Sequence, residues 1–162
     1  VQMEAIIRGV RNEFESALKE RDIQFNTKDL EGLPSITADP DMLKKVFYHL
    51  VMNAIKYTPD GGKVKVSGRY INGSEPPQLE VIVSDTGIGV DQGMHELIFQ
   101  KFHQTGEVLL HSSGKTKFKG GGPGLGLAIA REIAQAHGGK IGVRSSVGHG
   151  TTFTIRLPLA QK

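Results

Sequence analysis

Asn53-Ala54-Ile55-Lys56-Tyr57-Thr58 closes the most regular helical pattern of the chain, and the fold is predicted outward from this stretch. A capping carboxylate and a proline stand together in Asp39-Pro40-Asp41, which is typical of a helix N-terminus. Pro59-Asp60-Gly61-Gly62 supplies residues that end helices. Between these signals, apolar residues recur at helical spacing in one stripe: Leu43, Val46, Phe47, Leu50, Ala54 and Ile55. The pattern predicts an amphipathic helix that packs on a core through this stripe.

The rest of the chain predicts two more helices and a set of strands. Helical periodicity covers the first ~20 residues and returns from 124 to 137, where Gly138-Gly139 ends it. Apolar alternation and short apolar runs predict strands at 22–26, 64–70, 79–84, 140–145 and 151–157. Together these elements predict an α+β fold. We expect a two-layer sandwich, with about three helices covering one face of a mixed, mostly antiparallel sheet.

Composition narrows the function classes. The 162 residues suffice for one domain, and we expect residues 1–162 to form one. The absence of Cys excludes disulfides, thiolate metal sites and Cys nucleophiles, and it is compatible with a reducing cytoplasm. A net charge of +3 without a Lys/Arg run argues against a nucleic-acid face, and no apolar run is long enough to span a membrane. We expect no direct membrane contact by this domain, although a longer parent protein could be membrane-anchored. Val1 opens the chain without a signal peptide, so we expect a cytoplasmic segment of a longer protein.

Four polar side chains share one edge of the helix that ends at Thr58. His49, Lys56 and Tyr57 lie four residues before, three after and four after Asn53. These offsets place all four beside the apolar stripe rather than in it. An amide oxygen can coordinate Mg²⁺, a lysine can meet phosphate oxygens, and a tyrosine ring can cover a base. Taken alone, the same pattern also fits a solvated helix face.

Asp85-Thr86-Gly87-Ile88-Gly89 follows the strand predicted at 79–84. A carboxylate at a strand end can accept a hydrogen bond from an exocyclic amino group, which adenine carries. Gly87 and Gly89 allow a positive φ and leave room for a ring to lie close. The block is also compatible with an ordinary Asp-Gly turn.

A glycine cluster, Gly120-Gly121-Gly122-Pro123-Gly124-Leu125-Gly126, opens the helix predicted from 124. Free N–H groups and partial positive charge at such a terminus attract phosphate. Rossmann and P-loop sites are excluded, because no strand runs directly into the glycines and no Gly-Lys-Ser/Thr follows them. A flexible hinge remains the alternative. The poorly patterned stretch before it, about 91–121, is expected to be a functional lid.

In this order, the blocks resemble the ATP-binding catalytic domain of sensor histidine kinases. Its Bergerat-type fold is shared with the gyrase, Hsp90 and MutL ATPases. The resemblance covers nearly the whole chain. Asn53 falls in the asparagine box, 85–89 in the first glycine box and 122–127 in the second, and Phe99-Gln100-Lys101-Phe102 matches the phenylalanine box.

The resemblance implies a role for each block. Asn53 holds Mg²⁺, Lys56 contacts phosphate, Tyr57 packs on the base and Asp85 reads the adenine amino group. The lid spans about 91–121, with Lys115, Lys117 and Lys119 near the phosphates, although these lysines fit solvated loop charges equally well. The implied catalytic residues are Asn53 and Lys56. The implied ATP-binding set is Asn53, Lys56, Tyr57, Asp85, Gly87, Gly89, Phe102, Lys119, Gly122, Gly124, Leu125, Gly126 and Leu127.

Two differences from the family pattern indicate which kind of member this chain resembles. Hydrolysing relatives carry a glutamate four residues before the asparagine, where this chain has His49, so rapid ATP hydrolysis is not expected. His49 either helps bind Mg²⁺ or lines the site. The chain also holds no phosphoacceptor motif, since His95-Glu96-Leu97 lacks the following proline.

The resemblance therefore implies a kinase whose acceptor histidine lies on a separate dimerisation domain. From there the phosphoryl group would pass to a response regulator receiver domain. ATP and Mg²⁺ are the expected cofactors. An ATP-hydrolysing clamp of the same fold and a degenerate binding module are the alternatives.

Overall fold

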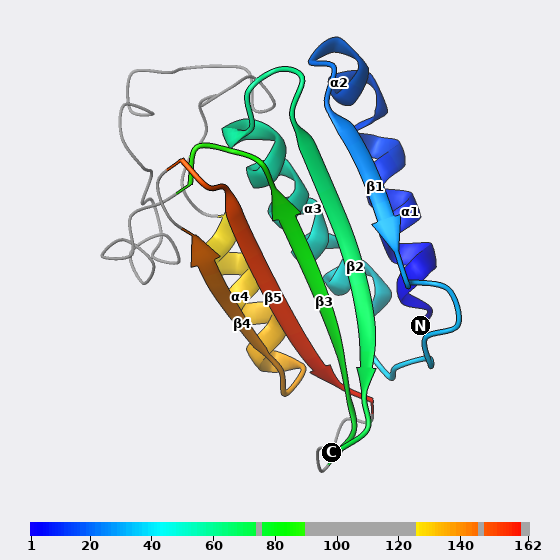
Figure 1. Cartoon of the computed structure of the whole chain (residues 1–162). Coiled ribbons are helices and arrows are strands. Elements are labelled where there is room, and N and C mark those ends of the chain that lie inside the picture. The colour runs from blue at the N-terminus through cyan, green and yellow to red at the C-terminus, as the bar shows by residue number, and fades with distance from the viewer. Residues whose placement is uncertain (74–75, 90–125, 146–147, 160–162) are drawn as a thin grey trace.

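A computed structural model of the chain, shown in Figure 1, describes residues 1–73, 76–89, 126–145 and 148–159. Its elements are α1 (Met3–Glu13), α2 (Glu15–Glu20), β1 (Gln24–Lys28), α3 (Pro40–Tyr57), β2 (Lys63–Ile71), β3 (Gln78–Asp85), α4 (Gly126–Ala136), β4 (Lys140–Ser145) and β5 (Thr151–Pro158). Among these described residues, no helix is both long and apolar enough to cross a membrane.

The strands form a five-stranded sheet in the order β1-β2-β3-β5-β4. β1 runs parallel to β2, and the other neighbours are antiparallel. The helices lie together on one face of the sheet (Figure 1). The predicted α+β sandwich with a mixed, mostly antiparallel sheet is therefore confirmed.

The core lies between the helices and the covered face of the sheet. α3 is its centre, because Leu43, Val46, Phe47, Leu50, Val51, Ala54 and Ile55 are all buried. On the strands, alternate apolar residues face the helices: Val64, Val66, Leu79, Val81, Val83, Phe153, Ile155 and Leu157. Asp39 caps α3 as predicted, since its Oδ1 accepts hydrogen bonds from the Asp41 and Met42 backbone N–H groups at 2.9 and 3.2 Å.

Most predicted boundaries agree with the structure to within one or two residues, and two of the differences have a clear structural cause. The first helix breaks at Phe14, whose ring is buried and stacks on the Tyr48 ring at a centroid distance of 4.9 Å. This tertiary contact interrupts the helix, although the apolar periodicity of the sequence continues through Phe14. The first strand begins at Gln24 instead of residue 22, because Asp22 adopts a positive φ of 53° in the turn after α2.

A buried arginine ties the end of α3 to the turn after α2. Arg21 donates from Nη1 to the Ile55 carbonyl at 2.6 Å, from Nη2 to the Thr58 carbonyl, and from Nε to Asp60 Oδ1 at 2.7 Å. The last carbonyls of a helix have no partners within it, so an outside donor must satisfy them when they are buried. Arg21 fulfils that need and fixes the chain on either side of Tyr57.

We expect Arg21→Ala to lower the free energy of unfolding by about 2–4 kcal/mol, because buried carbonyls lose a charged donor. Urea denaturation measures the loss. Arg8→Ala is the matched control, since Arg8 is exposed on α1 and pairs with Glu4 one turn away. That change should cost less than about 0.5 kcal/mol. Similar losses in the two variants would contradict the stabilising role of the Arg21 hydrogen bonds.

Candidate nucleotide-binding site

The last residue of β3, Asp85, is a half-buried carboxyl group with one oxygen already engaged. Its Oδ1 accepts hydrogen bonds from the Gly87 backbone N–H at 2.8 Å and the Thr151 backbone N–H at 3.3 Å. Within the described part of the chain, no group donates to Oδ2. Burial raises the pKa of Asp85 to about 6, although the two backbone hydrogen bonds act to lower it. The site therefore presents an oriented carboxyl oxygen to an incoming donor.

Glycines are required beside Asp85 because neighbouring atoms lie too close to leave room for a Cβ. A Cβ on Gly87 would lie 2.4 Å from the Tyr57 carbonyl oxygen and 2.6 Å from Asp85 Oδ1. A Cβ on Gly150 would lie 2.1 Å from the Asp85 carbonyl oxygen. The positive φ expected for this loop occurs at Gly89, with φ 75°, but not at Gly87. Gly87 is therefore needed for space and not for its φ.

The loop after Asp85 is held against three elements. The Ile88 N–H donates to the Tyr57 carbonyl at 3.1 Å, at the end of α3. Thr86 exchanges two hydrogen bonds with the Lys63 backbone at the start of β2, at 3.1 and 3.0 Å. The Gly148 N–H donates to the Ile88 carbonyl at 2.7 Å, before β5. Two sequence blocks that lie far apart in the chain, 53–58 and 85–89, thus meet at one end of the sheet.

The four polar residues on α3 are all half-buried, as their place beside the apolar stripe predicts. Lys56 Nζ lies 5.6 Å from the centroid of the Tyr57 ring, and burial lowers the pKa of Lys56. The His49 ring meets the Tyr48 ring edge-on at a centroid distance of 5.6 Å, and its Nδ1 is buried. This edge of α3 is neither fully solvated nor part of the core.

The third block is described only at its end. Gly126 is the first residue of α4, and Leu127 is half-buried against the core. The other predicted residues of this region lie outside the described residues: Phe102, Lys115, Lys117, Lys119, Gly122, Gly124 and Leu125, with the phenylalanine box, His95 and the lid at 91–121.

Two contributions to the site were not predicted. The Thr151 N–H holds the Asp85 carboxyl group, and Gly150 allows β5 to begin against the Asp85 backbone. The glycines at 148 and 150 signalled a turn, but nothing in the sequence showed that this turn packs on Asp85. No group of three or more His, Asp or Glu able to hold a metal ion occurs in the described ranges.

This sandwich, with a half-buried carboxyl group at a strand end and a polar helix edge beside it, defines a nucleotide-binding domain. Residues 38–161 match the family described as histidine kinase-, DNA gyrase B- and HSP90-like ATPases. The match runs from the cap of α3 to the end of β5, so the chain belongs to this family.

Its relatives place the chain among the catalytic domains of histidine kinases. Sensor histidine kinase WalK of Bacillus subtilis (strain 168) is 37% identical over 149 residues, which are 89% of this chain and 22% of WalK. The catalytic domain of histidine kinase ThkA aligns with TM-score 0.77 and 27% identity over 99% of this chain and 94% of that one. Full-length ShkA in complex with AMPPNP aligns with TM-score 0.81 and 30% identity over 100% of this chain and 31% of that one.

The chain spans only a minor part of the curated relatives it matches. It covers 9% of hybrid signal transduction histidine kinase D of Dictyostelium discoideum, for example, at 34% identity over 90% of this chain. This chain therefore corresponds to the ATP-binding catalytic part of these relatives.

We expect the Asp85 carboxyl group to titrate near pH 6 in nuclear magnetic resonance spectra, and Asp85→Asn to identify its resonance. The pKa of Asp85 in the folded chain lies above the ordinary aspartate value of 3.8, so the folded state holds this proton more tightly than the unfolded state. The contribution of Asp85 to stability should therefore grow as the pH falls from about 6 toward 4 and vanish in Asp85→Asn. A midpoint near 4 would contradict the environment described for Asp85.

Proposed function

We propose that this domain binds ATP·Mg²⁺ and donates the γ-phosphate to a histidine on a separate dimerisation domain. The observation that carries the proposal is the Asp85 carboxyl group, which is half-buried beside the end of α3 and receives no hydrogen bond at Oδ2 from the described residues. Membership of an ATPase family and the AMPPNP complex of ShkA support an adenine nucleotide as that ligand.

The adenine end of the site follows from Asp85 and its loop. Oδ2 accepts a hydrogen bond from the adenine amino group, while the engaged Oδ1 keeps the carboxyl group in position. Gly87 and Gly89 let the base approach the backbone, and the Tyr57 ring packs on the base. Guanine offers an oxygen where adenine has its amino group, so the same carboxylate disfavours GTP.

At the phosphate end of the site, α3 and the glycine cluster provide the contacts. Lys56 contacts phosphate oxygens, and its partial burial strengthens that attraction because less water screens the charge. Phe102, Lys119, Gly122, Gly124, Leu125, Gly126 and Leu127 complete the ATP-binding set, and residues 91–121 act as the lid. The N–H groups at the start of α4 would face the phosphates.

Asn53 is the proposed protein ligand of Mg²⁺. The described residues offer no cluster of three acidic or histidine ligands, and Mg²⁺ fits such a site because it keeps several waters and binds substrate phosphates. When bound, the ion neutralises charge on the phosphates. His49 lies one turn before Asn53, and the burial of its Nδ1 leaves only Nε2 as a second candidate ligand.

The reaction needs a nucleophile from elsewhere. A histidine nitrogen attacks the γ-phosphorus in line, the bond to the ADP oxygen breaks, and phosphohistidine and ADP form. This chain positions the phosphates through Asn53, Lys56 and the amides at 122–126, which is most of what phosphoryl transfer demands. His49 in place of a glutamate disfavours the ATP-hydrolysing clamp, whose sign would be steady phosphate release by this domain alone.

We also infer the context of the domain from its relatives. Residues 1–162 act as one ATP-binding unit in the cytoplasm, while the dimerisation, phosphoacceptor and sensor parts belong to other residues of a longer protein. The solved complex of ThkA with the response regulator protein TrrA supports a receiver domain as the next phosphate acceptor. No membrane or nucleic-acid contact is proposed for the ATP site.

We expect Asp85→Asn to weaken AMPPNP binding by roughly ten- to a hundredfold, because a charge-assisted hydrogen bond is worth about 1.5–3 kcal/mol. Calorimetry with AMPPNP and Mg²⁺ measures the effect, and the guanine analogue should bind neither form. Asp29→Asn is the matched control, since Asp29 is exposed at a positive φ that Asn tolerates. Unchanged affinity in Asp85→Asn would remove Asp85 from adenine recognition.

We expect Asn53→Ala to abolish autophosphorylation of the longer parent protein and to weaken Mg²⁺-dependent nucleotide binding, because the ion loses its protein ligand. Incorporation of labelled phosphate measures the first effect and calorimetry with and without Mg²⁺ the second. Asn12→Ala, at an exposed position of α1, is the control. Normal phosphate incorporation in Asn53→Ala would show that Asn53 has no part in the reaction.

A further inference from the structure

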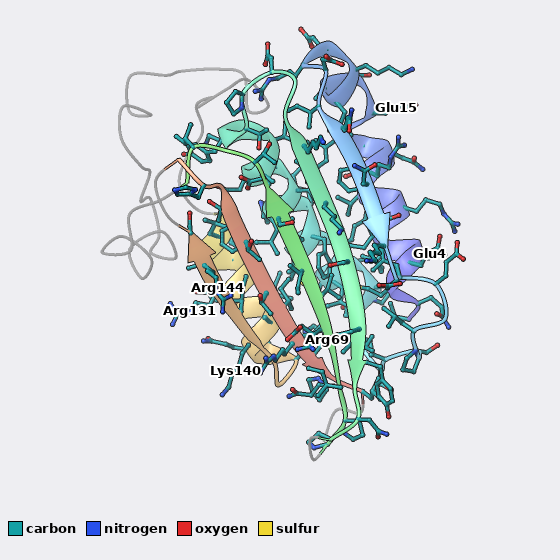
Figure 2. All side chains as sticks on the ribbon, viewed as in Figure 1. Glu4, Glu15, Arg69, Arg131, Lys140 and Arg144 are labelled. Carbon is teal, nitrogen blue, oxygen red and sulfur yellow. The ribbon has the colours of Figure 1, made fainter. Side chains whose placement is uncertain are left out.

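The face of the sheet opposite the helices carries a row of charged residues. Pairing across four strands places Arg69 of β2 beside Glu80 of β3, Glu80 beside Arg156 of β5, and Arg156 beside Lys140 of β4. Arg144, four residues after Lys140 on the same strand, faces the same way by the alternation of β4. Figure 2 shows the labelled Lys140 and Arg144 extending from β4 and Arg69 from β2.

One buried carboxylate holds two of these arginines in place. Glu80 is 3% exposed and accepts hydrogen bonds from Arg69 Nε at 2.7 Å and Arg156 Nε at 2.8 Å. Burial alone would raise the pKa of Glu80, but the hydrogen bonds and charges of the two arginines outweigh burial and lower it. Glu80 is therefore ionised, and the arginine side chains remain 65% and 51% exposed.

The charge on this face is unbalanced. Arg69, Arg156, Lys140 and Arg144 bring four positive charges against the one negative charge of Glu80. This row therefore carries an excess of positive charge, whereas Glu4 and Glu15 lie on the helices α1 and α2 (Figure 2).

A shallow hollow of about 590 Å³ lies among these cations. Ile82, Thr152 and Thr154 contribute to its lining, together with Gly142. Gly142 leaves open space on β4, since a Cβ built on it would meet nothing within 4 Å. The surface therefore combines a small apolar and hydroxyl floor with a cationic rim.

We propose that this face is a docking surface for an acidic segment of a protein partner. Carboxylates of the segment pair with the four cations at the rim, and an apolar side chain enters the space beside Gly142 and Ile82. Arginine is suited to this contact because its planar guanidinium group binds carboxylates in a bidentate geometry.

The chemistry of the hollow favours a peptide over a nucleic acid. Single-stranded nucleic acids are held by aromatic rings that stack on the bases, and this hollow is lined by Ile and Thr instead of rings. The proposed surface is separate from the Asp85 side chain, because Glu80 and Asp85 lie an odd number of residues apart on β3 and therefore face opposite sides of the sheet.

The test is fluorescence anisotropy with a labelled peptide of Glu-Glu-Leu-Glu repeats. The variant Lys140→Glu/Arg144→Glu reverses two rim charges and leaves the Glu80 pairs intact. We expect it to bind the peptide roughly tenfold more weakly than the unchanged chain, because attraction at two exposed positions becomes repulsion. Raising the salt concentration should weaken binding to the unchanged chain, since exposed charges are screened.

The control variant is Arg11→Glu/Lys19→Glu, which makes the same charge change on the exposed surface of α1 and α2. It should lose less than about twofold in peptide affinity. AMPPNP affinity should be unchanged in both variants, so loss of peptide binding is separable from any failure of the ATP site. Three results would each overturn the proposal: no peptide binding, equal losses in the two variants, or tighter binding of a labelled oligothymidylate to the same face.

Discussion

The last carbonyl groups of α3 are the constraint on which both the core and the site depend. A helix cannot satisfy them itself, and here they are buried, so donors from other elements must reach them. Arg21 supplies hydrogen bonds to the carbonyls of Ile55 and Thr58, and the Ile88 N–H supplies one to Tyr57. One short stretch therefore joins the turn after α2 to the loop after β3. The polar edge of α3 and the Asp85 carboxyl group keep their relative positions because of these bonds.

The two acidic residues of β3 differ in their hydrogen-bond partners and in the direction of their pKa shifts. This difference indicates a structural role for Glu80 and is consistent with the proposed ligand-binding role of Asp85. Glu80 has two arginines within hydrogen-bond distance, and its pKa is lowered. Among the described residues, the donors to Asp85 are two backbone N–H groups, both at Oδ1, and burial raises its pKa to about 6. Glu80 is thus satisfied within the fold, whereas Asp85 retains an oxygen whose best partner is a ligand donor. Such an environment is typical of functional sites.

Local signals in the sequence predicted much of this arrangement. The cap at Asp39, the apolar stripe of α3 and the strand that ends at Asp85 are each set by a few neighbouring residues, so the sequence was sufficient for them. The break at Phe14 was missed because it depends on stacking with Tyr48, which lies far along the chain. The role of Arg21 was missed for the same reason, since its partner carbonyls are 34 and 37 residues away. The Thr151 N–H carries no side-chain signal at all.

The placement of helices on one face of the sheet separates two kinds of contact. The proposed ATP site lies at the end of the sheet where α3, β3 and β5 meet, and the proposed acceptor histidine would approach there for in-line transfer. The open face carries its cations on the opposite side of the same strands, from the level of Glu80 to that of Ser84. A partner held on that face need not cover Asp85 or exclude the acceptor domain. A sheet covered on both faces would lack this second surface, so the two-layer architecture allows binding of a partner and phosphoryl transfer to proceed together.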